Sequence, residues 1–177
     1  MESFNQIKNR RILVDTNILV YCGNKDFGHQ AKGLLRTLKD NNNALAISHV
    51  SYFELIKNAI DQNLRKYYFH LVSYIHNLPI KQDILVSGST LYHLYSNRGI
   101  KEYKKIESMD LIIAGTVVFH KGALLLTANR RHFPMPFWRN ISQGYITYKD
   151  GEAYRLINIY LLEFDYAQIP QKNKVER

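Results

Sequence analysis

Short apolar runs alternate with stretches of helical periodicity along this chain. We interpret three short apolar runs, residues 12–14, 44–47 and 123–126, as buried strands, and the first of them is too brief and too β-branched for a helix. Apolar residues recur at helical spacing over residues 31–38, 64–75, 84–95 and 109–120. Further helices are expected from near Ile18 and after Ser48 or Ser51, either of which offers a cap. This order predicts an α/β fold, a parallel-sheet sandwich with helices on both faces.

The pattern changes towards the C-terminus. From Tyr145 onwards, aromatic and aliphatic residues flank Asp150-Gly151, a dipeptide typical of hairpin turns. Residues 171–177 are polar and predicted to be a disordered tail. We therefore expect a main domain over residues 1–140 and a hairpin extension over residues 141–170 packed on it. A lysine-rich connector that begins at Lys101 is expected to be an exposed loop.

Composition narrows the class of protein. The 177 residues suit one domain, and the single cysteine, Cys22, excludes an internal disulfide and a multi-cysteine zinc site. No signal peptide is visible, and the longest apolar run, residues 111–119, is too short to span a bilayer. We expect a cytoplasmic protein without membrane contact. The net charge of +9 favours a polyanionic partner such as nucleic acid.

Much of this positive charge is accompanied by aromatic rings. No acidic residue lies between Phe119 and Asn140. Cations beside rings suit single-stranded nucleic acid, because cations meet phosphates while rings stack on bases. The alternative is that the rings of Phe133, Phe137 and Trp138 pack a loop onto the core. The candidate RNA-binding cations are Lys121, Arg130, Arg131 and Arg139.

Polar residues stand where a ligand crevice is expected. Asp15 follows the first strand, and Thr127 and Asn129 follow the third; the carboxyl ends of parallel strands line the crevice of open α/β sheets. Glu54 and Asp110 fall near helix starts.

Each carboxylate also has a purely structural interpretation. Asp15 or Asn17 would cap the helix that follows. Glu54 fits a capping box with Ser51. Asp110 would complement the dipole of its helix.

Taken in order, four motifs resemble those of PIN-domain ribonucleases, especially the toxins of VapBC-type toxin–antitoxin pairs. The motifs are Ile-Leu-Val-Asp-Thr-Asn, Ser-His-Val-Ser-Tyr-Phe-Glu-Leu, Asp-Leu-Ile-Ile-Ala and Leu-Leu-Thr-Ala-Asn-Arg-Arg-His-Phe, within residues 11–133. The resemblance implies that Asp15, Glu54 and Asp110 are catalytic carboxylates that bind Mg²⁺ or Mn²⁺. It implies that Thr16, Asn17 and Thr127 shape the site. Many family members carry a fourth acid where this chain has Asn129, to which we assign a catalytic role.

The resemblance further implies a metal-dependent endoribonuclease that cleaves single-stranded or loop RNA by metal-activated water. It implies a toxin with a cognate antitoxin partner and a homodimeric state. Two alternatives stay open: a non-catalytic module that binds RNA or an antitoxin, and a phosphatase of the haloacid-dehalogenase type. In the latter a second Asp is expected two residues after the first, where this chain has Asn17. For a metal centre, the carboxyl groups of Asp15, Glu54 and Asp110 should lie within roughly 4 to 8 Å of one another.

Overall fold

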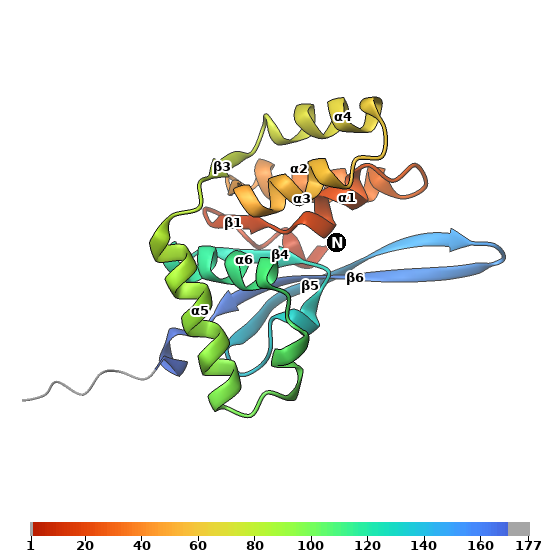
Figure 1. Ribbon diagram of the computed structural model, residues 1–177. Helices are drawn as coiled ribbons and strands as arrows, with labels where there is room; N and C mark the ends of the chain where they lie inside the picture. Colours follow the sequence, from red (N-terminus) through yellow and green to blue (C-terminus); the bar gives the residue numbers. More distant parts are fainter. Residues whose placement is uncertain (1, 170–177) are drawn as a thin grey trace, which may run out of the picture.

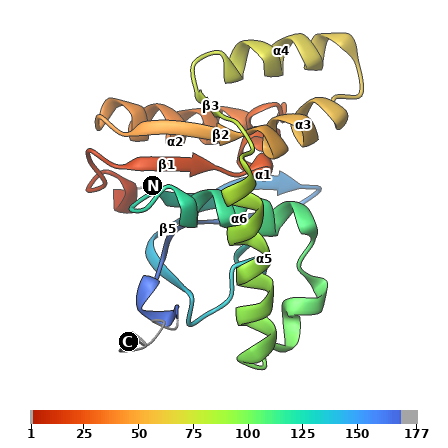
Figure 2. The same cartoon turned by 60° about the vertical axis from the view of Figure 1, so that its left-hand side comes forward.

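The computed structural model describes residues 2–169, which form one six-stranded mixed sheet between two layers of helices (Figures 1 and 2). The strand order is β3-β2-β1-β4-β6-β5. The first four strands are parallel, and β6 is antiparallel to both of its neighbours. The strands are β1 (Arg11–Val14), β2 (Ala44–Ser48), β3 (His76–Leu78), β4 (Leu124–Thr127), β5 (Trp138–Asp150) and β6 (Ala153–Phe164). This confirms the predicted α/β class.

Each face of the sheet is covered by its own set of helices. One face carries α1 (Thr16–Cys22), α2 (Gly28–Asp40), α3 (His49–Lys57) and α4 (Gln62–Val72), and the other carries α5 (Gln82–Asn97) and α6 (Ser108–Phe119). Short 3-10 helices span Glu2–Phe4, Lys101–Lys105, Arg130–His132 and Tyr166–Gln168. Among residues 2–169, no helix has the length and apolar character needed to cross a membrane.

The central strand shows why the first apolar run has no polar alternation. Ile12 and Val14 pack into the core beneath α1 and α2, whereas Leu13 packs into the core beneath α5 and α6. All three are at most 1% exposed. A parallel strand covered on both faces is expected to be continuously apolar.

Several element boundaries differ from the sequence prediction. Helix α1 begins at Thr16 rather than near Ile18. The helix predicted over residues 64–75 ends at Val72, and the residues that follow it form β3, a three-residue edge strand parallel to β2. The connector after α5 contains a 3-10 helix, and Ile106 at its end is buried, so it is more than an exposed loop.

The predicted C-terminal hairpin is confirmed, but it is longer than expected and belongs to the sheet. Strand β5 begins at Trp138, so the expected boundary after residue 140 falls inside it. Strand β6 pairs with β4 from Leu124↔Glu163 to Thr127↔Tyr160, which joins the hairpin to the parallel strands. The turn holds Gly151 at a φ of 63°, a left-handed conformation that favours glycine. The predicted disordered tail lies outside the described residues.

Candidate active site

Asp15 lies one residue beyond the carboxyl end of β1, in the middle of the parallel strands. Its backbone N–H donates to the carbonyl of Leu126 on β4, so the strand pairing holds this residue before the chain turns into α1. Asp15 has the extended conformation of a helix cap, but its side chain forms no capping hydrogen bond. The capping interpretation of Asp15 is therefore wrong.

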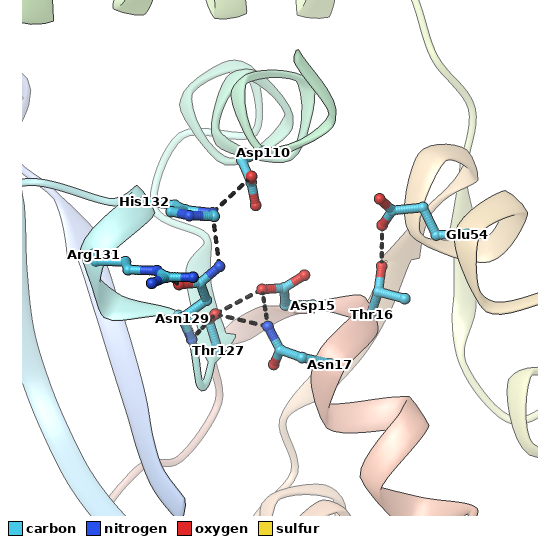
Figure 3. Close-up of polar contacts among 9 residues, drawn as sticks. All are labelled: Asp15, Thr16, Asn17, Glu54, Asp110, Thr127, Asn129, Arg131 and His132. Carbon is cyan, nitrogen blue, oxygen red and sulfur yellow. Dashed lines mark hydrogen bonds and ion pairs between the residues drawn. The ribbon is translucent and has the colours of Figure 1, made fainter. Parts of the chain in front are cut away.

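The carboxylate of Asp15 instead accepts hydrogen bonds from two neighbouring side chains (Figure 3). Its Oδ2 accepts from Thr127 Oγ1 and from Asn17 Nδ2, each at 2.6 Å. Asn17 Oδ1 accepts from the backbone N–H of Ala128 at 3.0 Å, which fixes the orientation of the amide. Asn17 and Thr127 therefore position Asp15 through only one of its two oxygens, and their site-shaping role stays a prediction.

Glu54 reaches the same cleft from the second turn of α3. Its Oε2 accepts from Thr16 Oγ1 at 2.6 Å. The cap of α3 is Ser48, which accepts from the backbone N–H of Ser51. Glu54 is consequently not part of a capping box with Ser51, and Thr16 lies beside it at the cleft.

Asp110, in the first turn of α6, is paired with a residue to which the sequence assigned no role. His132 Nδ1 lies 2.8 Å from Asp110 Oδ2 and 2.7 Å from Asn129 Nδ2. Because Nδ1 carries one hydrogen or none, it either donates to the carboxylate or accepts from the amide, and cannot do both at once. The side chains of His132 and Asp110 are only 13% and 14% exposed. Asn129 thus belongs to a polar group that contacts Asp110, at the position where the sequence resemblance would have placed a fourth acid.

The surroundings of both aspartates disfavour their ionised forms. Burial raises the pKa of Asp15 to about 6; the negative charge of Asp110 adds to this effect, and the hydrogen bond from Thr127 opposes it. Burial also raises the pKa of Asp110, while His132 acts in the opposite direction and Glu107 and Glu54 add repulsion. Carboxylates that raise one another's pKa create a site that a cation would stabilise.

One cleft of ≈ 380 Å³ contains all three predicted carboxylates. It is also lined by Glu107, which directly precedes α6, and by Arg131 and His132. Figure 3 shows Asp15, Asp110 and Glu54 approaching this space from three separate elements. The convergence predicted from the sequence is therefore found, with Glu107 and His132 as additions.

The donor set suits a hard divalent cation. Four carboxylates line the cleft, those of Asp15, Glu54, Glu107 and Asp110, and carboxylate oxygens are preferred ligands of Mg²⁺ and Mn²⁺. Among the side chains that the structure describes, no three of His, Cys, Asp or Glu are grouped closely enough to hold a metal ion by themselves. Mg²⁺ commonly binds through one or two carboxylates and keeps several waters, so the residues present fit an ion of that kind.

The predicted RNA-binding cations lie at different places. Arg131 is exposed and lines the cleft, with Nε 3.2 Å from Asn129 Oδ1. The guanidinium of Arg130 donates to the carbonyls of Phe133 and Trp138, so it fixes the loop after β4. Arg139 pairs with Glu163, which lies opposite Leu124 at the far end of β4 from Thr127.

Lys121 precedes β4, so it too lies at the edge of the sheet opposite the cleft. The rings of Phe133, Phe137 and Trp138 are fully buried. They therefore pack the loop onto the core, and the base-stacking interpretation of these three rings is wrong.

Comparison with known proteins gives a consistent family and fold. The family model described as PIN domain matches residues 12–135. A toxin–antitoxin complex from Klebsiella pneumoniae contains a chain of TM-score 0.54 and 25% identity; the match covers 71% of this chain and 92% of that one.

Two further structures share the fold. For VapBC2 from Rickettsia felis, bound to a DNA fragment from its promoter, the TM-score is 0.57 and the identity 22%, with 70% and 90% of the two chains covered. For VapBC-1 from nontypeable Haemophilus influenzae the values are 0.51 and 25%, with the same coverage. No curated protein matches the chain significantly in sequence.

Proposed function

Since this chain belongs to the PIN domain family, we propose that it is a divalent-metal-dependent endoribonuclease and the toxin of a toxin–antitoxin pair. The family match removes the basis for the haloacid-dehalogenase alternative, which rested on Asp15 alone. One observation carries the proposal: Asp15, Glu54 and Asp110 come from three elements and line one cleft.

The chain's own side chains supply orientation and charge in this cleft. Thr127 and Asn17 both bind Oδ2 of Asp15, which fixes the orientation of its carboxylate. Thr16 holds Glu54 in the same way. His132 holds Asp110 and keeps it close to Asn129. The four carboxylates that line the cleft also repel the phosphates of RNA, so a bound cation would favour the approach of the scissile phosphate.

Asp15, Glu54 and Asp110 would hold Mg²⁺ or Mn²⁺. A divalent ion bound by such carboxylates supplies an activated water and neutralises charge on the phosphate under attack. Asn129 would add a neutral oxygen or an N–H donor in place of a fourth charge, which favours one tightly held ion over two. Arg131, at the mouth of the cleft, is placed to meet a neighbouring phosphate.

The test is cleavage of a mixed single-stranded RNA pool by the purified chain with Mg²⁺ or Mn²⁺, with and without chelator. Cleavage that stops with chelator and returns with added metal supports the proposal, whereas chelator-resistant cleavage contradicts it. The second candidate, a non-catalytic binding module, is favoured by one observation: the described side chains include no group of three His, Cys, Asp or Glu close enough to hold a metal ion. It predicts RNA or antitoxin binding without cleavage under any metal condition.

The antitoxin partner is proposed from the structural neighbours, which are toxin–antitoxin complexes. Such a partner would be expected to co-purify with the chain when the two are expressed together. The homodimer implied by the sequence resemblance stays a prediction, and sedimentation equilibrium of the purified chain would test it.

Arg131 is expected to be the main phosphate contact among the four candidate cations. Because each contact to a single strand contributes about 0.7 to the slope of log affinity against log salt, Arg131→Ala should flatten the slope by about that amount. Arg139→Ala and Lys121→Ala, at the opposite edge of the sheet, are matched charge-removing controls and should leave the slope unchanged. RNA binding measured by fluorescence anisotropy between 50 and 300 mM salt, in roughly the range where such slopes are resolved, distinguishes the two sets. A slope that changes with Arg139 and not with Arg131 would move the RNA path to the other edge.

A further inference from the structure

The β5–β6 hairpin extends well beyond the sheet to which it belongs (Figure 1). The last pair between β6 and β4 is Thr127↔Tyr160. Residues 144–159, here called the arm, pair across the hairpin only with each other. Thr127 also marks the carboxyl end of β4, where Asp15 is held, so the arm starts at the edge of the sheet that carries the cleft. The family model ends at residue 135, and the arm is therefore an addition to the shared domain.

One face of the arm is packed against the body. Directly opposed residues of antiparallel strands share a face, so Ile146 and Ile157 lie together, as do Tyr148 and Arg155. Ile146 is fully buried, and the Tyr148 ring lies 5.1 Å from that of Phe27. These contacts hold the arm in place.

The other face is open and chemically distinctive. It carries the opposed pairs Tyr145↔Asn158, Thr147↔Leu156 and Lys149↔Tyr154. Tyr145, Leu156 and Tyr154 are 57%, 61% and 79% exposed and together give this face an exposed apolar patch. These six positions, here called the open face, include no carboxylate. Asp150 at the turn is paired with Arg155 of the packed face.

The open face is continuous with the cleft. A second hollow of ≈ 500 Å³ joins them, lined by Asn17, Tyr21, Ala128, Asn129, Arg130, Arg131, Asn158 and Tyr160. Asn17, Asn129 and Arg131 also line the carboxylate cleft, whereas Asn158 belongs to the open face. A continuous surface therefore runs from Asp15 past Arg131 to Asn158 and then along the open face to Tyr145 and Tyr154. At about 3.4 Å per residue, Tyr154 lies roughly 20 Å along the strand from Tyr160, enough for several nucleotides.

We propose that the open face of the arm is a binding platform for the single-stranded RNA that leaves the cleft. This inference rests on the proposed nuclease function and adds where the substrate runs. The exposed rings of Tyr145 and Tyr154 lie on this one face, on neighbouring strands, and suit base stacking, which tolerates any base because each has a flat apolar face. Asn158 offers amide hydrogen bonds, Lys149 and Arg131 offer positive charge, and the lack of carboxylates leaves phosphates unopposed. The overall charge of +9 is in keeping with this polyanion.

The test is binding of a fluorescent single-stranded 12-nucleotide RNA to the full chain in chelator, followed by anisotropy. Stacking on one ring typically contributes at least a fivefold change in affinity, so Tyr145→Ala/Tyr154→Ala should bind about 25-fold more weakly. Tyr145→Phe/Tyr154→Phe keeps both rings and should bind like the wild type. Tyr74→Ala is the matched control, because Tyr74 is 61% exposed and lines neither the carboxylate cleft nor the second hollow.

A second measurement compares cleavage of this RNA with cleavage of a short oligonucleotide that fills the cleft alone. The double alanine variant should lose kcat/KM on the long substrate and keep it on the short one. Equal affinity of wild type and double variant for the long RNA overturns the proposal, even if the wild type cleaves. If the wild type never cleaves RNA but the double alanine variant binds RNA more weakly than the wild type, the platform is supported and the nuclease function is wrong. If the variant instead changes only the sedimenting mass, the open face is an interface between copies, and the RNA platform is wrong.

Discussion

Asp15→Asn is expected to lower RNA cleavage by about two to three orders of magnitude and to stabilise the metal-free protein at the same time. The loss follows from the position of Asp15, whose carboxylate is buried and is held by Thr127 and Asn17. Removing its charge removes a hard ligand that no neighbour on β1 replaces. Asn129→Ala removes only a neutral group and should lower the rate of RNA cleavage by about tenfold.

The stabilisation follows from the raised pKa of Asp15, which is about 6 in the folded chain against an ordinary value of 3.8. The folded state then binds the proton more tightly than the unfolded state, so stability falls as the pH rises from about 4 to about 6. Above this window the ionised carboxylate costs on the order of 3 kcal/mol. An amide carries no such charge. The free energy of unfolding of Asp15→Asn should therefore exceed that of the wild type by up to about 3 kcal/mol at pH 7.5.

Urea denaturation of the chelator-treated proteins at pH 7.5 and pH 4 measures this effect. The gain should be present at pH 7.5 and disappear at pH 4, where Asp15 itself is protonated. Asp26→Asn is the matched control, since it removes an exposed carboxylate outside the cleft and should change neither stability nor cleavage. A destabilised Asp15→Asn protein at pH 7.5 would show that the carboxylate serves the fold and not the site.

Asp110→Asn is expected to cause a loss of cleavage similar to that of Asp15→Asn, about two to three orders of magnitude. Its carboxylate faces the same cleft from α6, on the opposite side from β1, and His132 positions it. If the two aspartates act on one ion, their losses are not additive. The double variant should then be at most about tenfold slower than either single variant.

The rates of the two single variants and the double variant, measured on the same RNA at saturating Mg²⁺, provide the test. His132→Gln is an informative companion, because it leaves Asp110 charged and removes only its positioning contact. His132→Gln should lower the cleavage rate less than Asp110→Asn does, and a higher Mg²⁺ concentration should partly restore this rate. Multiplying losses in the double aspartate variant would mean that Asp15 and Asp110 belong to independent functions.

The position of the site could be predicted from the sequence because it depends on strand ends. A buried run such as residues 12–14 fixes the face and direction of β1, and Asp15 follows directly from it. Thr127 is fixed in the same way by β4, and parallel pairing then brings the two ends together. Asp110 and Glu54 were predicted because helices in such folds begin at this edge.

Contacts between distant side chains could not be predicted. Glu54 had a good local explanation in Ser51, and only the tertiary structure shows that Thr16 is its partner. His132 carried no local signal beyond its spacing of three from Asn129, which a 3-10 turn places on one side. The cations of residues 121–139 form one basic stretch in the sequence, yet β4 separates Lys121 from Arg131 in space. The guanidinium of Arg130 is bound to the backbone carbonyl of Trp138.

The hairpin was recognised from Asp150-Gly151, but its relation to the sheet was not. Local turn chemistry predicts that two strands pair with each other and gives no information on a third partner. The pairing of β6 with β4 depends on the burial of Leu161 and Leu162 on opposite faces of the sheet. Strand β3 was missed for a related reason: three half-exposed and exposed residues at an edge have no apolar periodicity.

The central claim is that the carboxylates of Asp15, Glu54 and Asp110 make one divalent-cation site. Calorimetric titration of Mn²⁺ into the chelator-treated chain at pH 7.5 tests it most directly, with Asp15→Asn and the control Asp26→Asn beside the wild type. We expect one Mn²⁺ per chain in the wild type and in Asp26→Asn, and binding at least about tenfold weaker in Asp15→Asn, because one hard charged ligand is lost. Equal Mn²⁺ affinity in wild type and Asp15→Asn, or no binding in the wild type, would contradict the claim.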